Sequence, residues 1–359
     1  MANAIKPIIK LTEACNYSCT FCRYANHKQG GTKMDIEMVK KILFQSAEYN
    51  RGKSNNVKVI FHGGEPLLWG INNFREIIQY EKKITEETGV FFKNSVQTNA
   101  SLIDDDWINL FVANHISVGI SIDGPIELNE HHSNNIAESC RKTLTAIQRI
   151  KAYGGSCGVL SVITNNHINM GAKVFYDFLV DNNIYNCGLC YCYNPEDDCS
   201  VDATKLGTYL INLFDLYFAG HTRMNIREFN GAIYKILKGK TNCCNHNCRT
   251  VCGDYLTFVP SGDTFFCDAY DIKKENSLGN IIENNVVQML SSEKYRNLVQ
   301  IIQNRAKSFC CDCNVKSICG YGCPRTDNVN GNENYFCTTN KMLYSHIASK
   351  VAENTNIIQ

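Results

Sequence analysis

Three cysteines near the N-terminus are the residues best placed to do chemistry. Cys15, Cys19 and Cys22 are separated by three and then two residues, directly after an apolar run. Thiolates are the usual protein ligands of iron–sulfur clusters. Because a cubane cluster has four irons, three cysteines from one loop leave one iron without a protein ligand. The spacing therefore predicts a cluster with an open iron at which chemistry can occur.

Zinc and disulfide bonds are alternative uses for the 20 cysteines of this chain. Structural zinc sites normally close with four ligands, and the three N-terminal cysteines have no nearby fourth. A secreted disulfide scaffold is disfavoured because the chain is long and its cysteines cluster at metal-ligand spacings. Residues 1–12 also lack the apolar core of a signal peptide. Clusters in a reducing cytosol are the preferred interpretation.

Composition narrows the class of partner. Lys plus Arg (36) nearly equals Asp plus Glu (35), which indicates neither nucleic acid nor an anionic membrane as the partner. No run approaches the ~18 apolar residues of a membrane span. We expect a cytoplasmic protein whose 359 residues form one large or two medium domains.

From residue 5 to about residue 230, short β-rich runs alternate with amphipathic helical stretches, which predicts a parallel α/β sheet. About six βα units are fewer than the eight of a closed barrel, so we expect a partial (β/α)6 TIM-like barrel that is open on one side. Strands are predicted at 5–11, 57–61, 91–97, 117–122, 158–163 and 187–193. Helices are predicted at 34–49, 71–86, 104–114, 137–152, 169–183, 203–219, 226–237 and 340–353.

Polar motifs follow the predicted strands. The cysteine loop follows the first strand, Gly63-Gly64-Glu65-Pro66 follows the second, and Ser121 and Asp123 end the fourth. Ligands of parallel α/β folds bind at the carboxyl ends of strands, so these motifs should converge on one face. From residue 241 to residue 337 the chain has eleven cysteines and little periodicity. There we expect clusters, rather than a hydrophobic core, to organise the chain.

The N-terminal triplet, with Phe21 before its last cysteine, resembles the signature of the radical S-adenosylmethionine (radical SAM) superfamily. The resemblance implies that SAM chelates the open iron and is cleaved to a 5′-deoxyadenosyl radical, while the protein orients and shields the chemistry. Gly63 and Gly64 match the superfamily's glycine-rich motif, and Glu65 would accept hydrogen bonds from the SAM amino group.

Further residues resemble the SAM-contacting strand ends of that superfamily. They are Thr98, Asn99, Ser121 and Asp123, and the resemblance implies that Ser121 hydrogen-bonds the ligand. For Thr98, Asn99 and Asp123, capping of loops is an equally good interpretation.

The C-terminal cysteines resemble a second pattern, that of the SPASM domain, and match all seven of its positions. The resemblance implies two auxiliary clusters, and so three [4Fe-4S] clusters in all. It also implies domains at 1–238 (radical SAM partial barrel), 239–339 (SPASM) and 340–359 (C-terminal helix). The distal cluster would be bound by Cys310, Cys313, Cys319 and Cys337, and the proximal cluster by Cys252, Cys267, Cys323 and one upstream residue, either Cys244 or Cys248, with Cys243 less favoured.

The remaining cysteines have simpler interpretations. Cys311 is a spare thiol beside a ligand, and Cys140 and Cys157 are expected to be small buried apolar residues. Cys187, Cys190, Cys192 and Cys199 could form another metal site, but we favour a structural role for them.

Much of the chain resembles the anaerobic sulfatase-maturating enzymes, which oxidise Cys or Ser to formylglycine. The stretches Gln97-Thr98-Asn99 and Cys267-Asp268 carry this likeness. It implies that Asp268 is the general base and that Tyr24 is an active-site tyrosine. Asp268 could instead cap a loop.

Two departures favour a different member of the family. His62 stands where those enzymes usually have glutamine, and Leu67 and Leu68 follow the glycine-rich motif. These residues look more like the maturases of ribosomally made peptides (RiPPs). Because the chain starts directly at the first strand, recognition of a leader peptide would use the barrel or the SPASM region.

Our leading hypothesis is therefore a peptide maturase that forms a thioether or carbon–carbon crosslink. Formylglycine formation is the close alternative, and a non-catalytic iron–sulfur electron carrier is a remote one, weakened by the glycine-rich motif. We expect a monomer that acts on a peptide or protein and receives electrons from a donor such as flavodoxin or ferredoxin.

Overall fold

A computed structural model describes most of the chain, namely residues 4–22, 30–129, 135–193, 200–220, 224–239, 253–268, 272–327 and 333–354. The chain forms two compact units, each assembled from segments that are distant in sequence. The first unit comprises Met1–Ser121, Glu130–Cys157 and Gly253–Asn297. The second comprises Ile122–Asn129, Gly158–Cys252 and Leu298–Gln359. None of the helices in the described ranges is long and apolar enough to cross a membrane.

A sheet of order β10-β9-β8-β1-β2-β3-β4 forms the centre of the first unit. Strands β1 to β4 are mutually parallel, and β8 is added in parallel at the free edge of β1. Strand β9 is antiparallel to β8, and β10 is antiparallel to β9. The bounds are β1 (Lys6–Lys10), β2 (Asn56–His62), β3 (Phe91–Thr98), β4 (Ser117–Ser121), β8 (Tyr255–Phe258), β9 (Asp263–Phe265) and β10 (Gly279–Asn280).

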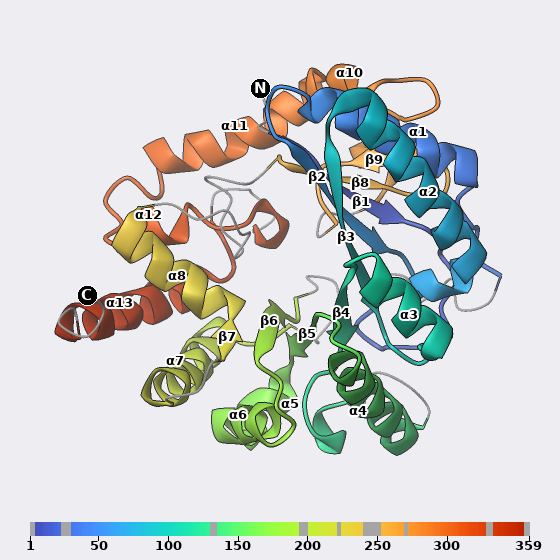
Figure 1. Cartoon of the computed structure of the whole chain (residues 1–359). Helices are drawn as coiled ribbons and strands as arrows, with labels where there is room; N and C mark the ends of the chain where they lie inside the picture. The colour runs from blue at the N-terminus through green and yellow to red at the C-terminus, as the bar shows by residue number, and fades with distance from the viewer. Residues whose placement is uncertain are drawn as a thin grey trace. The chain divides into compact units, whose positions relative to one another are not determined.

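Helices of the first unit cover this sheet. In Figure 1, α1 and α2 run side by side along β1 to β3. Helix α1 begins where Asp35 caps the Glu37 amide, and it buries Val39, Ile42 and Leu43 at helical spacing. The helices are α1 (Ile36–Asn50), α2 (Ile71–Thr88), α3 (Asp105–Ala113), α4 (Ile136–Ala152) and α10 (Val286–Leu290), with 3-10 turns η2 (Pro66–Trp69) and η4 (Lys274–Asn276).

The second unit has three parallel strands in the order β5-β6-β7. Its C-terminal helix α13 packs on α7 and α8. The strands are β5 (Cys157–Ile163), β6 (Asn186–Tyr191) and β7 (Asn225–Ile226). The helices are α5 (Asn165–Met170), α6 (Ala172–Asp181), α7 (Ala203–Ala219), α8 (Arg227–Lys238), α12 (Lys316–Cys319) and α13 (Cys337–Glu353), with 3-10 turns η3 (Ile126–Leu128) and η5 (Pro324–Thr326). Helix α11 (Glu293–Lys307) starts in the first unit and ends in the second.

The predicted alternation of strands and helices is confirmed, with six βα repeats from β1 to α7. One helix was predicted wrongly. The stretch 169–183 is not continuous, because Gly171 adopts a φ of +86° between α5 and α6. Such a backbone conformation is outside the helical range and favours glycine, so the helix is interrupted there.

The segment from residue 253 to residue 297 differs from expectation. It was predicted to lack a hydrophobic core, yet Leu256, Phe258 and Phe266 are buried. Its strand β8 pairs with β1, with Ile9 opposite Phe258. Helix α11 was also not predicted. The alternating pattern typical of a strand could not be recognised in β8, β9 and β10, because each has only two to four residues. The domain boundaries at residues 239 and 340 stay predictions.

Candidate functional site

The N-terminal cysteine loop follows β1 in the first unit. Cys15, Cys19 and Cys22 are all half-buried. The Tyr17 amide donates to the Cys15 sulfur at 3.4 Å, and the Cys22 amide donates to the Cys19 carbonyl at 3.1 Å. Backbone hydrogen bonds thus fold the loop that carries the three thiols.

Asparagine side chains tie this loop to the end of β3. Asn99 Nδ2 donates to the side chain of Asn16 at 2.9 Å, and Asn16 Nδ2 donates to Ser101 Oγ at 2.8 Å. Asn99 Nδ2 also lies 4.0 Å from the Cys15 sulfur. Two of the predicted motifs therefore meet, as expected for the carboxyl ends of parallel strands.

The environment of Cys15 suits a cationic partner. Burial raises the pKa of its thiol to about 11, and the nearby Glu65, Cys19 and Cys22 add to this shift. A thiol of that pKa becomes a thiolate only when a metal binds it, because metal ligands must be deprotonated. The donor set therefore fits an iron–sulfur cluster, and Cys15, Cys19 and Cys22 would hold it.

The glycine pair brings the loop after β2 against the cysteine loop. Gly63 has a φ of +142°, and a Cβ there would overlap the Thr12 carbonyl. A Cβ on Gly64 would overlap the Ala14 carbonyl. Instead, the amide of Gly64 donates to Thr12 O at 2.7 Å. The close approach permitted by these glycines is to the chain's own backbone. Their predicted approach to SAM stays a prediction.

Glu65 is a buried acidic residue whose side chain accepts several hydrogen bonds from the protein. One oxygen accepts from the Leu67 amide at 3.0 Å and from Thr98 Oγ1 at 2.7 Å, and the other accepts from the Asn99 amide at 2.9 Å. Burial raises its pKa to about 7. A carboxylate offers about four lone-pair positions. Three donors from the protein thus leave room for one more, such as the amino group of SAM.

Ser121 and Asp123 lie in different units. Ser121 Oγ accepts from Gln97 Nε2 at 3.0 Å and is half-buried. Asp123 is fully buried, and its side chain accepts the Val162 amide at 2.7 Å. Its carbonyl lies 2.8 Å from His167 Nε2. These contacts of Asp123 are those of a loop cap, which was the alternative to SAM contact.

Asp268 forms an ion pair with Lys10, the last residue of β1. Lys10 is only 2% exposed, whereas the Asp268 side chain is 30% exposed. The other carboxylate oxygen of Asp268 lies 3.8 Å from His62 Nε2. Strand β9 is antiparallel to β8 and ends at Phe265, and Asp268, three residues later, reaches the Lys10 side chain. The predicted base therefore lies beside the residue after which the cysteine loop begins.

His62 is held in its neutral form. Burial and the charge of Lys10 lower its pKa to about 4, although Asp268 opposes this shift. At neutral pH the imidazole therefore carries no charge. It can donate or accept a hydrogen bond beside Asp268 without pairing with it as a cation.

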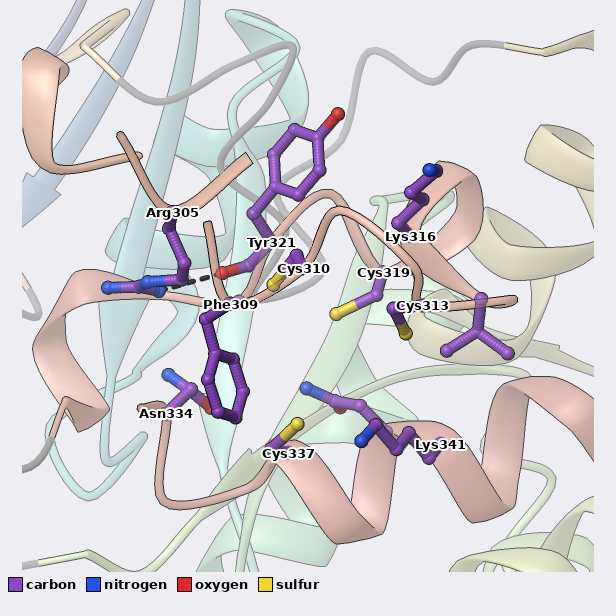
Figure 2. Close-up of a pocket in the computed structure, with 13 residues that line it drawn as sticks. Arg305, Phe309, Cys310, Cys313, Lys316, Cys319, Tyr321, Asn334, Cys337 and Lys341 are labelled. Atoms are coloured by element: carbon purple, nitrogen blue, oxygen red, sulfur yellow. Dashed lines mark hydrogen bonds between the residues drawn. The ribbon is translucent and has the colours of Figure 1, made fainter. Parts of the chain in front are cut away.

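In the second unit, four cysteines line one cavity, and Figure 2 shows their sulfurs around it. They are Cys310, Cys313, Cys319 and Cys337, the four that the sequence assigns to the distal cluster. Burial raises the pKa of the Cys319 thiol to about 12, against a hydrogen bond from the Gly322 amide. These thiols, too, would become thiolates on binding a metal. Their assignment as ligands stays a prediction, and the cavity fits it.

Cationic side chains surround the same cavity. Arg305, Lys316 and Lys341 all contribute to its lining. Charges on Arg305 and Lys341 lower the pKa values of Cys310 and Cys337, although burial raises both overall. Four thiolates bring more negative charge than the irons neutralise, so basic residues here stabilise a bound cluster.

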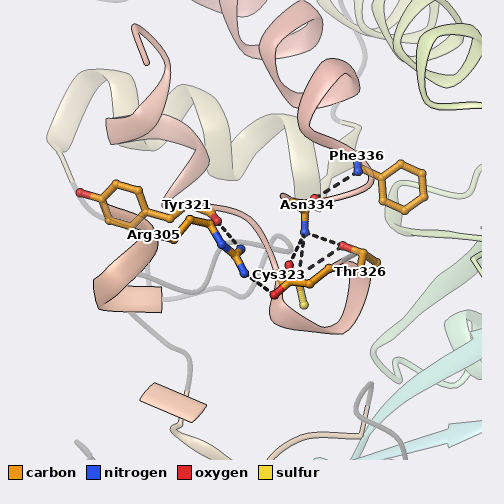
Figure 3. A network of polar contacts seen from close by, with 7 residues as sticks. Arg305, Tyr321, Cys323, Thr326, Asn334 and Phe336 are labelled. Atoms are coloured by element: carbon orange, nitrogen blue, oxygen red, sulfur yellow. Dashed lines mark hydrogen bonds and ion pairs between the residues drawn. The ribbon is translucent and has the colours of Figure 1, made fainter. Parts of the chain in front are cut away.

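A network of polar contacts fixes the turn between Cys319 and Cys323 (Figure 3). Arg305 is 3% exposed, donates to the Tyr321 carbonyl at 2.7 Å and forms an ion pair with Asp327. Asn334 Nδ2 donates to the Cys323 carbonyl at 2.7 Å. Tyr321 has a φ of +75°, a costly conformation for a residue with a side chain. The network therefore holds a turn that would otherwise relax.

Cys323 and Cys311 do not line the four-cysteine cavity. Cys323 lines a neighbouring cavity, and its assignment to the proximal cluster stays a prediction. Cys311 is exposed and contacts Asp312 at 3.3 Å, as a spare thiol would. Cys187 and Cys192 are buried. Tyr24, Cys199, Cys243, Cys244, Cys248 and Cys252 lie outside the described residues.

The spacing of the described thiols does not suit a single ion. Within the described ranges, no three His, Cys, Asp or Glu side chains are grouped closely enough to hold one metal ion. Sulfurs around one zinc ion all lie about 2.3 Å from it, whereas cluster ligands bind separate irons and stand farther apart.

Sequence reasoning missed Lys10 and Arg305. Each is a buried cation paired with a carboxylate. Lys10 did leave a signal, because it interrupts the apolar run Ile8-Ile9-Lys10-Leu11. A charge within a buried strand indicates a partner. Arg305 left no comparable signal, because it follows the polar residues Gln303 and Asn304 rather than interrupting an apolar run.

Two family profiles match the chain. Residues 9–170 match the radical SAM superfamily, and residues 248–314 match the SPASM iron–sulfur cluster-binding domain. The chain is 28% identical to a cysteine-type anaerobic sulfatase-maturating enzyme of Clostridium novyi, over 94% of this chain and 93% of that protein. It is 24% identical to a serine-type enzyme of Klebsiella aerogenes, with coverage of 93% and 82%.

Solved structures also resemble this fold. Native anSMEcpe with bound AdoMet and the Cp18Cys peptide superposes with a TM-score of 0.86, at 24% identity, covering 99% of both chains. Streptococcus suis SuiB bound to its precursor peptide SuiA superposes with a TM-score of 0.66, at 16% identity, covering 90% of this chain and 73% of that chain. At these identities the matches establish the fold.

Proposed function

Because this chain is a radical SAM enzyme with a SPASM domain and is homologous to the anaerobic sulfatase-maturating enzymes, we propose that it oxidises a cysteine or serine of a sulfatase to formylglycine. The resemblance, the fold class and the cofactors predicted from the sequence are thereby confirmed. The cofactors are SAM, its [4Fe-4S] cluster and auxiliary clusters. The alternative of a non-catalytic electron carrier is set aside.

Full-length similarity favours formylglycine formation over crosslinking, which was our leading hypothesis from sequence. The cysteine-type and serine-type relatives cover more than nine tenths of this chain. By name, both types mature sulfatases. The same chemistry would suit this chain if Asp268 is the base.

The observation that carries this proposal is the Lys10–Asp268 ion pair beside His62. When bound, SAM and the clusters supply a 5′-deoxyadenosyl radical and accept an electron. With that chemistry supplied, a cysteine substrate would lose a hydrogen atom and an electron, and a base of the protein would accept its proton. Water would then replace the sulfur, which would leave as hydrogen sulfide, and an aldehyde would remain.

Asp268 would take the proton in this sequence. Lys10 pairs with one carboxylate oxygen of Asp268. This ion pair orients the carboxylate. Its partly exposed oxygen remains within reach of a substrate. His62, which is neutral, can hydrogen-bond the substrate or a water molecule beside it.

Mass spectrometry of a peptide tests the proposal. The reconstituted and reduced enzyme would be incubated anaerobically with SAM and a peptide that contains Cys-x-Pro-x-Arg. We expect 5′-deoxyadenosine and an aldehyde that a hydrazide reagent traps on the cysteine. A matched peptide with alanine at that position should yield no aldehyde. Formation of 5′-deoxyadenosine with the cysteine unchanged would refute formylglycine formation.

RiPP crosslinking is the second candidate, and His62 favours it. That residue departs from the glutamine usual in formylglycine-forming enzymes, and it lies next to Asp268. Co-expression with a peptide encoded by the adjacent gene separates the two. Crosslinking removes two hydrogens and leaves no aldehyde, whereas formylglycine formation leaves a trappable aldehyde.

A further inference from the structure

Arg325 carries a guanidinium group that has no ion-pair partner among the described residues. It is half-buried, and its Nε atom is inaccessible to solvent. It makes no hydrogen bond or ion pair in the part of the chain that the structure describes. Because removing a guanidinium from water is costly unless a partner repays it, an unpaired one in a cavity indicates a ligand.

Arg305, in the same unit, is an arginine whose guanidinium does have partners. It is 3% exposed, and it pairs with Asp327 and the Tyr321 carbonyl. Arg305 thus has a carboxylate partner. Within the described residues, the more exposed Arg325 has none. This difference is expected if the carboxylate for Arg325 arrives from outside the protein.

Arg325 lines a small cavity whose other walls suit a carboxylate on an organic molecule. Aromatic rings of Tyr191 and Phe336 stand 5.5 Å apart, centroid to centroid, and form an apolar wall. Thr326 and Asn340 also line the cavity. A guanidinium fork binds a carboxylate through two parallel hydrogen bonds, while the rings would cover its carbon atoms.

Cys323 lines the same cavity. A molecule held by Arg325 therefore lies beside a residue assigned to the proximal cluster. A peptide substrate must be held near the redox machinery while it loses an electron. The position of the cavity thus matches a substrate subsite better than a remote regulatory site.

We propose that Arg325 and its cavity bind a carboxylate of the peptide substrate, from an acidic side chain or the C-terminus. This inference rests on the proposed function only in taking the substrate to be a peptide. The site sets which peptides bind and plays no part in hydrogen abstraction.

Chemical protection tests the site without turnover. Phenylglyoxal would be applied to the intact holoenzyme, and modification of each arginine followed by mass spectrometry. We expect Arg325 to react, with Arg305 as an unreactive internal control. Acetyl-Glu-amide should slow the reaction at Arg325 by about threefold, and acetyl-Gln-amide should not. Equal protection by the two compounds, or protection by neither, would overturn the proposal.

Binding of matched peptides extends the test. Two Cys-x-Pro-x-Arg peptides would differ only by Glu or Gln outside the core, and their Kd values would be measured anaerobically. The wild type should prefer the Glu peptide by about tenfold. Arg325→Gln should abolish that preference, and Arg325→Lys should retain part of it. Iron content and circular dichroism would verify that both variants fold.

The reduction potential of the auxiliary clusters distinguishes a substrate-binding arginine from one that serves a cluster. If Arg325→Gln keeps the Glu preference but shifts that potential, the guanidinium serves the cluster and the proposal is wrong. If the wild type prefers the Glu peptide yet forms no aldehyde, the carboxylate site stands and formylglycine formation fails. If the wild type binds the Glu and Gln peptides equally, the carboxylate site fails even where the aldehyde forms.

Discussion

The two groups of cysteines differ in the charges around them. Near Cys15, burial and the carboxyl of Glu65 both raise the pKa of the thiol. Around Cys310 and Cys337, Arg305 and Lys341 act in the opposite direction. A cluster closed by four thiolates needs positive charge from the protein. At the N-terminal site, the sulfonium and amino groups of SAM would bring that charge with the substrate.

Replacing one cysteine in each group should therefore have different consequences, and this comparison has the largest expected effect. Cys19→Ala should abolish 5′-deoxyadenosine formation, because the SAM-binding cluster would lose a ligand. Cys313→Ala should lower the iron content and stop peptide oxidation, while SAM cleavage remains measurable. Product analysis by liquid chromatography and iron assays would test both variants.

Cys311→Ala is the matched control for Cys313→Ala. Its thiol is exposed and lies outside the four-cysteine cavity, so iron content and turnover should be unchanged. If Cys19→Ala retained full activity, or if Cys311→Ala lost iron as Cys313→Ala does, the division of the cysteines would be wrong.

Asp268→Asn should have the next largest effect. The amide keeps the size of the carboxylate but cannot accept the proton. We expect peptide oxidation to fall by about 10²-fold or more, while SAM is still cleaved. Parallel measurement of 5′-deoxyadenosine and modified peptide would reveal the uncoupling. Unchanged peptide turnover would remove Asp268 from the role of base and leave it as a loop cap.

Arg305→Met should destabilise the second unit. It leaves Asp327, whose side chain is 10% exposed, without its partner and frees the Tyr321 carbonyl. Breaking a buried pair in this way costs about 3 kcal/mol of unfolding free energy, measurable by anaerobic denaturant titration. Arg325→Met is the matched control and should cost far less, because Arg325 has no partner to lose among the described residues. Equal losses would contradict the contrast between the two arginines.

Glu81→Gln should give the smallest effect and one that depends on pH. Glu81 is 5% exposed in the first unit and accepts a hydrogen bond from Asn94 at 2.6 Å, without a cation in the described part of the chain. Burial raises its pKa to about 8. The folded state thus favours the protonated carboxyl, so its contribution to stability is complete below about pH 4.5 and is lost as the pH rises through 8.

The wild type should therefore lose unfolding free energy between about pH 5 and pH 8. In Glu81→Gln this loss should shrink, and at pH 8 the variant should be more stable by about 2 kcal/mol. Glu48→Gln, at a side chain that is 44% exposed, should leave the pH dependence as it is. Identical pH profiles for wild type and Glu81→Gln would show that the buried carboxyl is not protonated.

Much of the fold could be predicted because its signals are local. The periodicity of Val39, Ile42 and Leu43 marked α1, and the alternation of strands and helices marked the βα repeats. The strands β8 to β10 were not predicted because they are short, and because β8 takes its partner from β1, which is distant in sequence. Pairing between residues about 250 positions apart leaves no periodic trace in either segment.

The sequence alone determined the reactive groups of this protein. The spacing of Cys15, Cys19 and Cys22 and of the later cysteines indicates the chemistry, because cluster ligands within one loop are fixed by their separation along the chain. Only the tertiary structure decided what surrounds them. It paired Lys10 with Asp268 and Arg305 with Asp327, and it left Arg325 unpaired among the described residues. Electrostatic partners are chosen by distance in space, which folding alone sets.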